Sequence, residues 1–191
     1  MKEIRKQRGF TLIEIMVAVA LFAVVMTISI GALLSLVEAN RKAQALNSIK
    51  DNLNFALENM SRNMRAGTTY HCSTNTLVPS DLDSPEDCAS GGVLVAFEKF
   101  DGDPADPGDQ VVYRFVANRI EKSVDGGSTF IPITASEVVI EDMKFYVVGT
   151  TQGDTKQPRI VMTIQGSAGV SARTVTNFNL QSTISQRVLD L

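Results

Sequence analysis

The chain has 191 residues, of which 20% are charged and 44% hydrophobic, and this composition is typical of a globular protein rather than a disordered one. That length allows one ordinary domain, or one domain together with a long helix. The formal net charge is −3, but residues 1–9 carry four basic residues against one acidic, which leaves 14 basic and 20 acidic residues in the remainder. An acidic remainder without a basic stripe argues against a nucleic-acid partner.

A long apolar run follows the basic start of the chain. From Ile15 to Val37 there is no charged residue, and the segment would extend roughly 34 Å as a helix, enough to cross a bilayer. The basic flank predicts that the amino end stays in the cytoplasm and that the rest faces outward. A secretory signal peptide cleaved after Ala20 would leave an apolar tail on its product. A plain membrane anchor fits the length but does not account for Glu14.

Glu14 lies inside the apolar run, close to its start. A carboxylate at the centre of a membrane helix costs on the order of 3 kcal/mol and usually has a partner. The run contains no Lys, Arg or His that could pair with it. Two interpretations remain open: the side chain extends to the cytoplasmic surface, or its partner comes from another molecule.

The segment Gly9-Phe10-Thr11-Leu12-Ile13-Glu14, after a short basic leader, resembles the processing motif of type IV pilins and type II secretion pseudopilins. The resemblance implies that a prepilin peptidase cuts between Gly9 and Phe10 and that Phe10 is then N-methylated. It also implies that the new amine meets Glu14 of a neighbouring subunit, and that a cytoplasmic ATPase and a membrane platform drive assembly. Displacement of such a pair in a helix bundle would leave both charges unpaired, so the pair would fix the stagger between subunits.

The helical pattern continues beyond the membrane. Apolar residues recur at helical spacing on one face, namely Leu46, Ile49, Leu53, Leu57, Met60 and Met64. We expect one helix over about residues 10–65, with a transmembrane half at 10–37, an amphipathic stalk at 38–66 and Gly67 as its C-cap. The end of this stalk resembles that of PilW-like and J-type (PulJ-like) minor pilins.

Beyond Gly67 the periodicity changes to that of strands. Seven are predicted, over residues 92–100, 110–117, 119–124, 129–133, 138–148, 159–165 and 173–185. Short connections favour an antiparallel meander packed on the outer half of the helix. The expected fold is therefore α+β, the pilin fold, with a leader at 1–9 and a β-rich extracytoplasmic domain at 67–191.

The two cysteines, Cys72 and Cys88, fall in a polar segment that contains prolines. Because the predicted topology places them outside the cytoplasm, we expect a disulfide between them. His71, the only histidine, is expected to be a loop residue, and a zinc site is not expected because tetrahedral zinc takes four ligands.

One acidic segment could bind a hard cation. Its candidate calcium ligands are Asp101, Asp103, Asp106 and Asp109. Their spacing is not that of an EF-hand, since Ala105 and Val112 stand where ligands are required. A solvated acidic hairpin loop is the favoured interpretation, and no cofactor is expected.

The sequence contains no nucleophile elbow, zinc-protease signature or phosphate loop, so no enzymatic activity is expected. We expect a minor pilin or pseudopilin, a subunit of a type IV pilus or type II secretion-like filament, anchored in the cell membrane before assembly and extracytoplasmic afterwards. Two alternatives remain open. One is a filament-tip adhesin, DNA-uptake receptor or other ligand-binding module on the same anchor, and the other is a single-pass surface protein that never assembles.

Overall fold

The computed structural model describes residues 9–103, 106–151, 153, 156–169 and 175–188. Except for Gly9, the predicted leader lies outside the described residues. The chain divides into two compact units, residues 1–44 and residues 45–191. Helix α1, Leu12–Ala66, contributes to both, and its bounds agree with the predicted helix over about residues 10–65.

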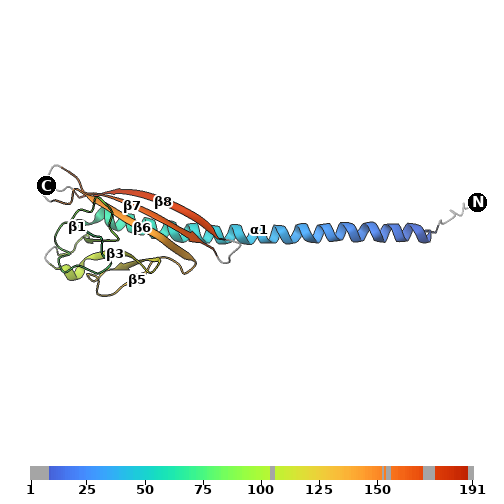
Figure 1. The fold of residues 1–191 in the computed structure, drawn as a ribbon, viewed down its shortest axis with the longest axis horizontal. Coiled ribbons are helices and arrows are strands. Elements are labelled where there is room, and N and C mark those ends of the chain that lie inside the picture. The colour runs from blue at the N-terminus through green and yellow to red at the C-terminus, as the bar shows by residue number, and fades with distance from the viewer. Residues whose placement is uncertain (1–8, 104–105, 152, 154–155, 170–174, 189–191) are drawn as a thin grey trace, which may run out of the picture. The chain divides into compact units, whose positions relative to one another are not determined.

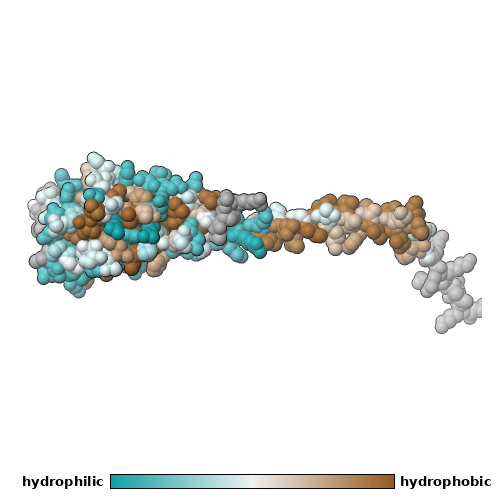
Figure 2. Space-filling view, turned by 60° about the horizontal axis from the view of Figure 1, so that its bottom comes forward, coloured by the Kyte–Doolittle hydropathy of each residue, from teal (hydrophilic) through white to brown (hydrophobic). Residues whose placement is uncertain are grey.

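The first unit consists of the amino-terminal part of α1. All of its described residues, 9–44, are exposed, and Figure 2 shows hydrophobic colour along most of this part of the helix. The hydroxyls of Thr27 and Ser29, which interrupt the apolar run, donate to the carbonyl oxygens of Ala23 and Val25, each at 2.7 Å. These bonds satisfy both hydroxyls within the helix, so neither needs water.

The second unit begins with the carboxyl-terminal part of α1, which packs on β-sheets through one face. Its buried residues are Ile49, Leu53, Ala56, Met60 and Met64. Of the predicted face, Leu46 and Leu57 are only half-buried. The helix ends at Ala66, and the N–H of Gly67 donates to the carbonyl oxygen of Asn63 at 3.0 Å.

Two antiparallel sheets form the rest of this unit (Figure 1). The first has the order β1 (Thr68–Ser73), β2 (Leu94–Glu98), β3 (Val111–Val116), β4 (Arg119–Ser123) and β5 (Ile131–Pro132), with the 3-10 turn η1 (Pro107–Asp109) before β3. The second has the order β6 (Val138–Val148), β7 (Arg159–Ala168) and β8 (Thr176–Ser185). Strand β8 is an edge, and no described strand pairs with its outer side.

The α+β class and the antiparallel pairing are therefore confirmed, while two details of the prediction were wrong. Strand β1 was not predicted, although it carries three consecutive buried residues, Tyr70, His71 and Cys72. The predicted single meander is instead two meanders, because after β5 the chain leaves the first sheet and β6 pairs with β7. The start of the last predicted strand, residues 173 and 174, lies outside the described residues.

The helix and both sheets bury their side chains in a common core. The apolar face of α1 supplies Met60 and Met64, the first sheet supplies Phe97 and Tyr113, and the second supplies its inward positions, which include Phe145. Strand β6 alternates buried and exposed residues except at a bulge between Ile140 and Asp142. Such alternation directs one face of the sheet to the core and leaves the other to water.

Candidate functional site

Phe10, the residue proposed to become the new terminus, is accessible. Its side chain is 77% exposed. Among the described residues, no atom beyond its chain neighbours would lie within 4 Å of a Cβ placed on Gly9. The Gly9–Phe10 peptide bond precedes α1, which begins at Leu12, so a protease can bind it as an extended segment without first unwinding the helix.

Thr11 and Glu14 form a reciprocal cap at the start of α1. The N–H of Glu14 donates to Thr11 Oγ1 at 3.3 Å, and the N–H of Thr11 donates to Glu14 Oε2 at 3.5 Å. This is the capping box, which satisfies two of the N–H groups that a helix start leaves unpaired. The positive end of the helix dipole also favours a carboxylate in the first turn. Glu14 therefore has a partner within its own chain, which the sequence analysis did not consider.

The helix behind this cap has the length and hydropathy of a membrane span. Its most apolar 18-residue window has a mean hydropathy of 2.6, and none of that window is buried. A helix that is apolar on all sides requires an apolar environment, either lipid or other helices. This surface fits membrane anchoring by length and composition.

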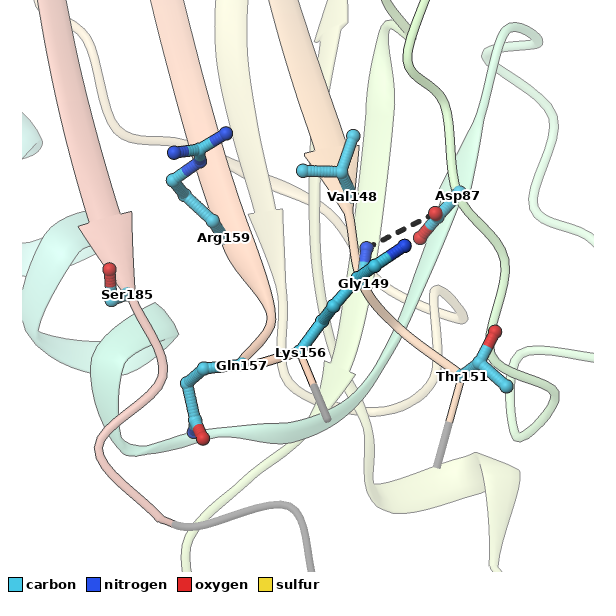
Figure 3. A pocket seen from close by; sticks show the side chains of 8 residues that line it. All are labelled: Asp87, Val148, Gly149, Thr151, Lys156, Gln157, Arg159 and Ser185. Atoms are coloured by element: carbon cyan, nitrogen blue, oxygen red, sulfur yellow. Dashed lines mark hydrogen bonds between the residues drawn. The ribbon is translucent and has the colours of Figure 1, made fainter. Parts of the chain in front are cut away.

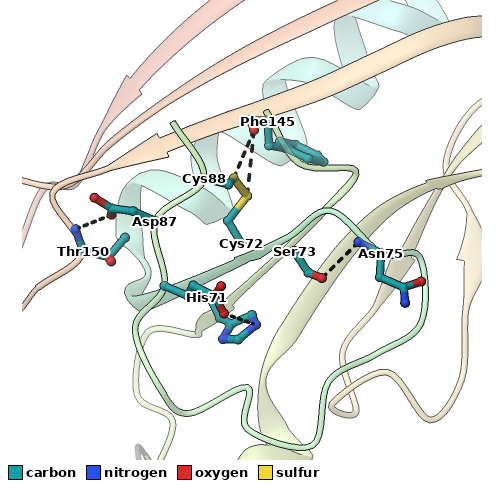
Figure 4. Close-up of a disulfide and its surroundings, with 9 residues drawn as sticks. His71, Cys72, Ser73, Asn75, Asp87, Cys88, Phe145 and Thr150 are labelled. Carbon is teal, nitrogen blue, oxygen red and sulfur yellow. Dashed lines mark hydrogen bonds and ion pairs between the residues drawn. A yellow bond between two sulfur atoms is a disulfide. The ribbon is translucent and has the colours of Figure 1, made fainter. Parts of the chain in front are cut away.

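The two cysteines lie close together in the core of the second unit, and their disulfide confirms the prediction (Figure 4). Cys72 and Cys88 have Cα atoms 5.7 Å apart. Their sulfurs lie 3.8 and 3.2 Å from the carbonyl oxygen of Phe145 on β6. Next to Cys88, Asp87 accepts hydrogen bonds from the N–H groups of Thr150 and Gly149 at 3.0 and 3.1 Å. The disulfide loop is thus held against both sheets.

His71 was wrongly expected to be a loop residue. It lies on β1 and is almost completely buried. Its Nδ1 is 2.8 Å from the carbonyl oxygen of Ser84, and its Nε2 is 3.5 Å from the Glu86 carboxylate. The backbones of Tyr70, Cys72 and Glu86 are also hydrogen-bonded to one another. These contacts hold residues 84–86, which precede Cys88, against strand β1.

The four aspartates proposed as weak calcium candidates lie in the connection between β2 and β3. Asp106 accepts from the N–H of Gly108 at 2.9 Å, and Asp109 accepts from the N–H of Asp103 at 3.2 Å and from Lys99 Nζ at 3.1 Å. Asp101 is exposed and has a left-handed backbone. Among the described residues, no three Asp, Glu, His or Cys side chains come together as a metal-binding group.

A polar cleft of about 640 Å³ opens near the end of β6 (Figure 3). Its lining residues are Asp87, Val148, Gly149, Thr151, Lys156, Gln157, Arg159 and Ser185. Burial opposes ionisation of Asp87, but hydrogen bonds from Thr150 and Gly149 and the charge of Lys156 outweigh it and lower the pKa of this carboxyl. Asp87 is thus an ionised acceptor for backbone N–H groups, which suits it to holding a turn rather than to transferring protons.

The structure shows three polar residues that the sequence analysis missed. Thr11 could have been found, because Thr-x-x-Glu before an apolar run is the sequence signature of a capping box. Glu98 and Gln110 are buried at the two ends of the connection between β2 and β3. Their positions next to the aspartate segment gave no signal, because pairing of β2 with β3 is what places them together.

In a comparison with protein families, residues 4–30 match the prokaryotic N-terminal methylation motif. The matched residues include the proposed cleavage position, the capping box and helix α1 as far as Ile30. This motif describes a structural protein rather than a class of enzymes. Comparison with curated proteins and with solved structures found no significant match.

Proposed function

We propose that this chain, whose N-terminal methylation motif supports the type IV pilin and pseudopilin family, is a minor structural subunit of a type IV pilus or type II secretion-like filament. Prepilin peptidase would remove residues 1–9 and methylate Phe10. The chain would be a single-pass membrane protein with a cytoplasmic amino end and would enter an extracytoplasmic filament, driven by an assembly platform and its ATPase. The observation that carries this proposal is the motif on an exposed apolar helix capped by Thr11 and Glu14.

The proposed role of Glu14 follows from its position in the first turn. Cleavage before Phe10 would create an ammonium group four residues away from a carboxylate whose one hydrogen bond within the described residues is weak, at 3.5 Å. In a medium of low dielectric constant an ammonium is a stronger partner than a backbone N–H. An amine from a neighbouring subunit could therefore displace the Thr11 contact when subunits pack together, and this exchange would set their register.

Mass spectrometry of the mature chain tests the processing step. The proposal expects a polypeptide that begins with N-methylated Phe10 when the chain is produced together with a prepilin peptidase. A chain recovered from filaments with its first nine residues intact would contradict it. A single-pass surface protein that never assembles would instead remain entirely in the membrane fraction.

Substitution of Glu14 tests the assembly step separately from processing. Glu14→Ala is expected to be inserted and cleaved normally but to enter filaments on the order of tenfold less, because a hydrogen bond to a charged group contributes about 1.5–3 kcal/mol. Quantitative blotting of sheared filaments against membranes measures the ratio. Glu38→Ala, at the next acidic position of the helix, is the matched control and should assemble normally. Normal incorporation of Glu14→Ala would contradict the role given to this carboxylate.

A further inference from the structure

Buried polar side-chain atoms without a hydrogen-bonded donor or acceptor among the described residues lie at the two ends of the connection between β2 and β3. Glu98 is 2% exposed and Gln110 is 0% exposed. No N–H or O–H group of the described residues donates to either oxygen of Glu98, to Oδ1 of Asp109 or to Oε1 of Gln110, and Nε2 of Gln110 has no acceptor there. Buried polar groups in folded proteins are almost always paired, so unpaired atoms gathered in one place need an explanation.

The register of the sheet directs these side chains toward one another. Phe97 pairs with Val111, so the next step of the antiparallel ladder sets Glu98 opposite Gln110 on the same face. Gly102 approaches Glu98 so closely that a Cβ there would overlap Glu98 Oε1 and would also lie 3.1 Å from Asp109 Oδ2. The chain therefore folds back over the Glu98 carboxylate, and glycine is the residue that leaves room for it.

Asp109 uses its two oxygens differently. Oδ2 accepts from Lys99 Nζ at 3.1 Å and from the N–H of Asp103 at 3.2 Å. Oδ1 is buried, and no described residue donates a hydrogen bond to it. Lys99, whose side chain is partly exposed, thus neutralises the outer side of this carboxylate. Within the described residues no ion pair is formed by Oδ1 of Asp109 or by the Glu98 carboxylate.

The charge around Glu98 is predominantly negative. Asp109 and Asp103 both act on it, and Lys99 is the opposing cation. The carboxyls of Glu98 and Asp109 lie within hydrogen-bonding reach of each other, and because a carboxylate only accepts, they could pair only by sharing a proton. Two carboxylates this close together at a buried position repel each other, so the site favours a group that compensates their charge, either a bound cation or a proton.

We propose that Glu98, Asp109 Oδ1 and Gln110 Oε1 bind a single hard divalent cation, with Ca²⁺ preferred. All of these ligands are oxygens, and calcium tolerates irregular geometry and two-oxygen carboxylate ligation, whereas magnesium demands a regular octahedron. Two carboxylates and one amide supply fewer than the six to eight oxygens that calcium takes, so backbone carbonyls or water complete the shell. This ligand set differs from the aspartate run considered in the sequence, because its central members are Glu98 and Gln110.

Calorimetric titration of the full-length protein in detergent, first stripped with a chelator, tests the site. With calcium chloride, one Ca²⁺ ion is expected to bind per chain with a dissociation constant of about 10⁻⁴–10⁻³ M, the range of extracellular calcium modules. With magnesium chloride, Mg²⁺ should bind at least about tenfold more weakly. Glu98→Gln is expected to weaken calcium binding at least about tenfold, because it removes one carboxylate. Gln110→Glu adds a carboxylate and should tighten binding.

Asp101→Asn is the matched control, since Asp101 lies in the same connection but is exposed, and its calcium affinity should equal that of the wild type. Circular dichroism spectra and melting curves establish that each variant is folded. No heat and no shift of the melting temperature on adding calcium to the wild type would overturn the proposal. Equal calcium responses from the wild type and Glu98→Gln would also overturn it. If the wild type does not bind calcium and Glu98→Gln has a higher melting temperature than the wild type at pH 8, the charge at the site is compensated by a shared proton, and the calcium proposal is wrong. None of these outcomes depends on filament assembly, so the site and the proposed function can fail independently.

Discussion

Tyr113 connects strand β3 to helix α1 through its hydroxyl group. Its oxygen accepts from Asn63 Nδ2 at 2.9 Å, and its O–H donates to Asn59 Oδ1 at 3.3 Å. Its ring packs against Phe97, with ring centroids 6.1 Å apart. Burial raises the pKa of Tyr113 to about 12, although the bond from Asn63 lowers it in part. Tyr113 is therefore a packing residue and a polar link at the same time.

Replacement of Tyr113 by Phe should change how stability depends on alkaline pH. In the unfolded chain the tyrosine ionises near pH 10, but in the folded chain it stays neutral up to a pKa of about 12. Below pH 10 the tyrosine is neutral in both states, so it does not make the free energy of unfolding depend on pH. From pH 10 to 12 it ionises in the unfolded state alone, and the free energy of unfolding therefore falls as the pH rises. Denaturant unfolding between pH 8 and 11.5 should show a shallower decline for Tyr113→Phe than for the wild type.

At neutral pH the same variant should lose about 1 kcal/mol of unfolding free energy, the net value of a typical hydrogen bond. Burial also raises the pKa of Tyr70, so part of the alkaline decline should remain in Tyr113→Phe. Identical slopes for the two proteins above pH 10 would show that Tyr113 does not carry the effect.

At the scale of elements, the second half of α1 is stabilised by a narrow apolar face. Met60 is fully buried among side chains from both sheets, whereas Phe55 on another side of the same helix is 71% exposed. A helix of this kind gains most of its stability from packing rather than from intrinsic propensity. Its exposed side carries polar contacts such as the Arg62–Glu58 ion pair, which at a solvent-exposed site contributes little.

Met60→Ala and Phe55→Ala form a matched pair that tests this face. Met60→Ala is expected to cost about 2–5 kcal/mol of unfolding free energy, because it removes buried methylene groups and leaves a cavity. Phe55→Ala should change the free energy by no more than about 0.5 kcal/mol, as is usual for exposed positions. Guanidinium unfolding of the unassembled protein in detergent measures both. Similar losses for the two variants would contradict the burial pattern.

The helix and most strands could be predicted from the sequence because their periodicity is local. The spacing of Ile49, Leu53, Met60 and Met64 already indicates the buried face, and all four are buried. Strand β1 could not be recognised, because Thr68–Ser73 directly follows the helix and has three buried residues in a row instead of alternation. The division into two sheets depends on which strands pair, and pairing over long sequence distances leaves no local pattern.

The candidate site shows the same distinction. The segment from Gly9 to Glu14 is contiguous, so its residues could be recognised together, and the Thr11–Glu14 cap adds to them. The oxygen cluster joins Glu98 to Gln110 across a hairpin, and only the register of β2 and β3 brings these two residues together. The sequence therefore suggested the neighbouring aspartates as cation ligands, although the buried residues Glu98 and Gln110 lie on either side of them.

At the scale of the molecule, the disulfide is a covalent tie within the second unit. Cys72 and Cys88 are separated by 16 positions, and the loop between them is held against β1 by the contacts of His71 and Glu86. Leu82 in this loop covers Leu94, Ala96 and Val112 on the first sheet. The loop thus covers part of the sheet surface, and the disulfide restricts its freedom in the unfolded chain.

Removal of the disulfide should destabilise the second unit without changing its fold. The double substitution of Cys72 and Cys88 by Ser is expected to lower the unfolding free energy by about 3 kcal/mol, because a loop of this length loses that much conformational entropy when it is closed in the unfolded state. Thermal unfolding followed by circular dichroism measures the loss. Wild-type protein treated with reductant is the control and should lose a similar amount, while an unchanged midpoint in both would contradict this contribution.

Strand β8 has a practical consequence for handling the protein. Its ten residues include no charge and no proline, the two devices that commonly prevent a sheet edge from recruiting foreign strands. At high concentration, molecules should therefore associate by pairing their β8 edges. Asn179→Lys, at a position whose side chain is exposed, should reduce this association and improve solubility.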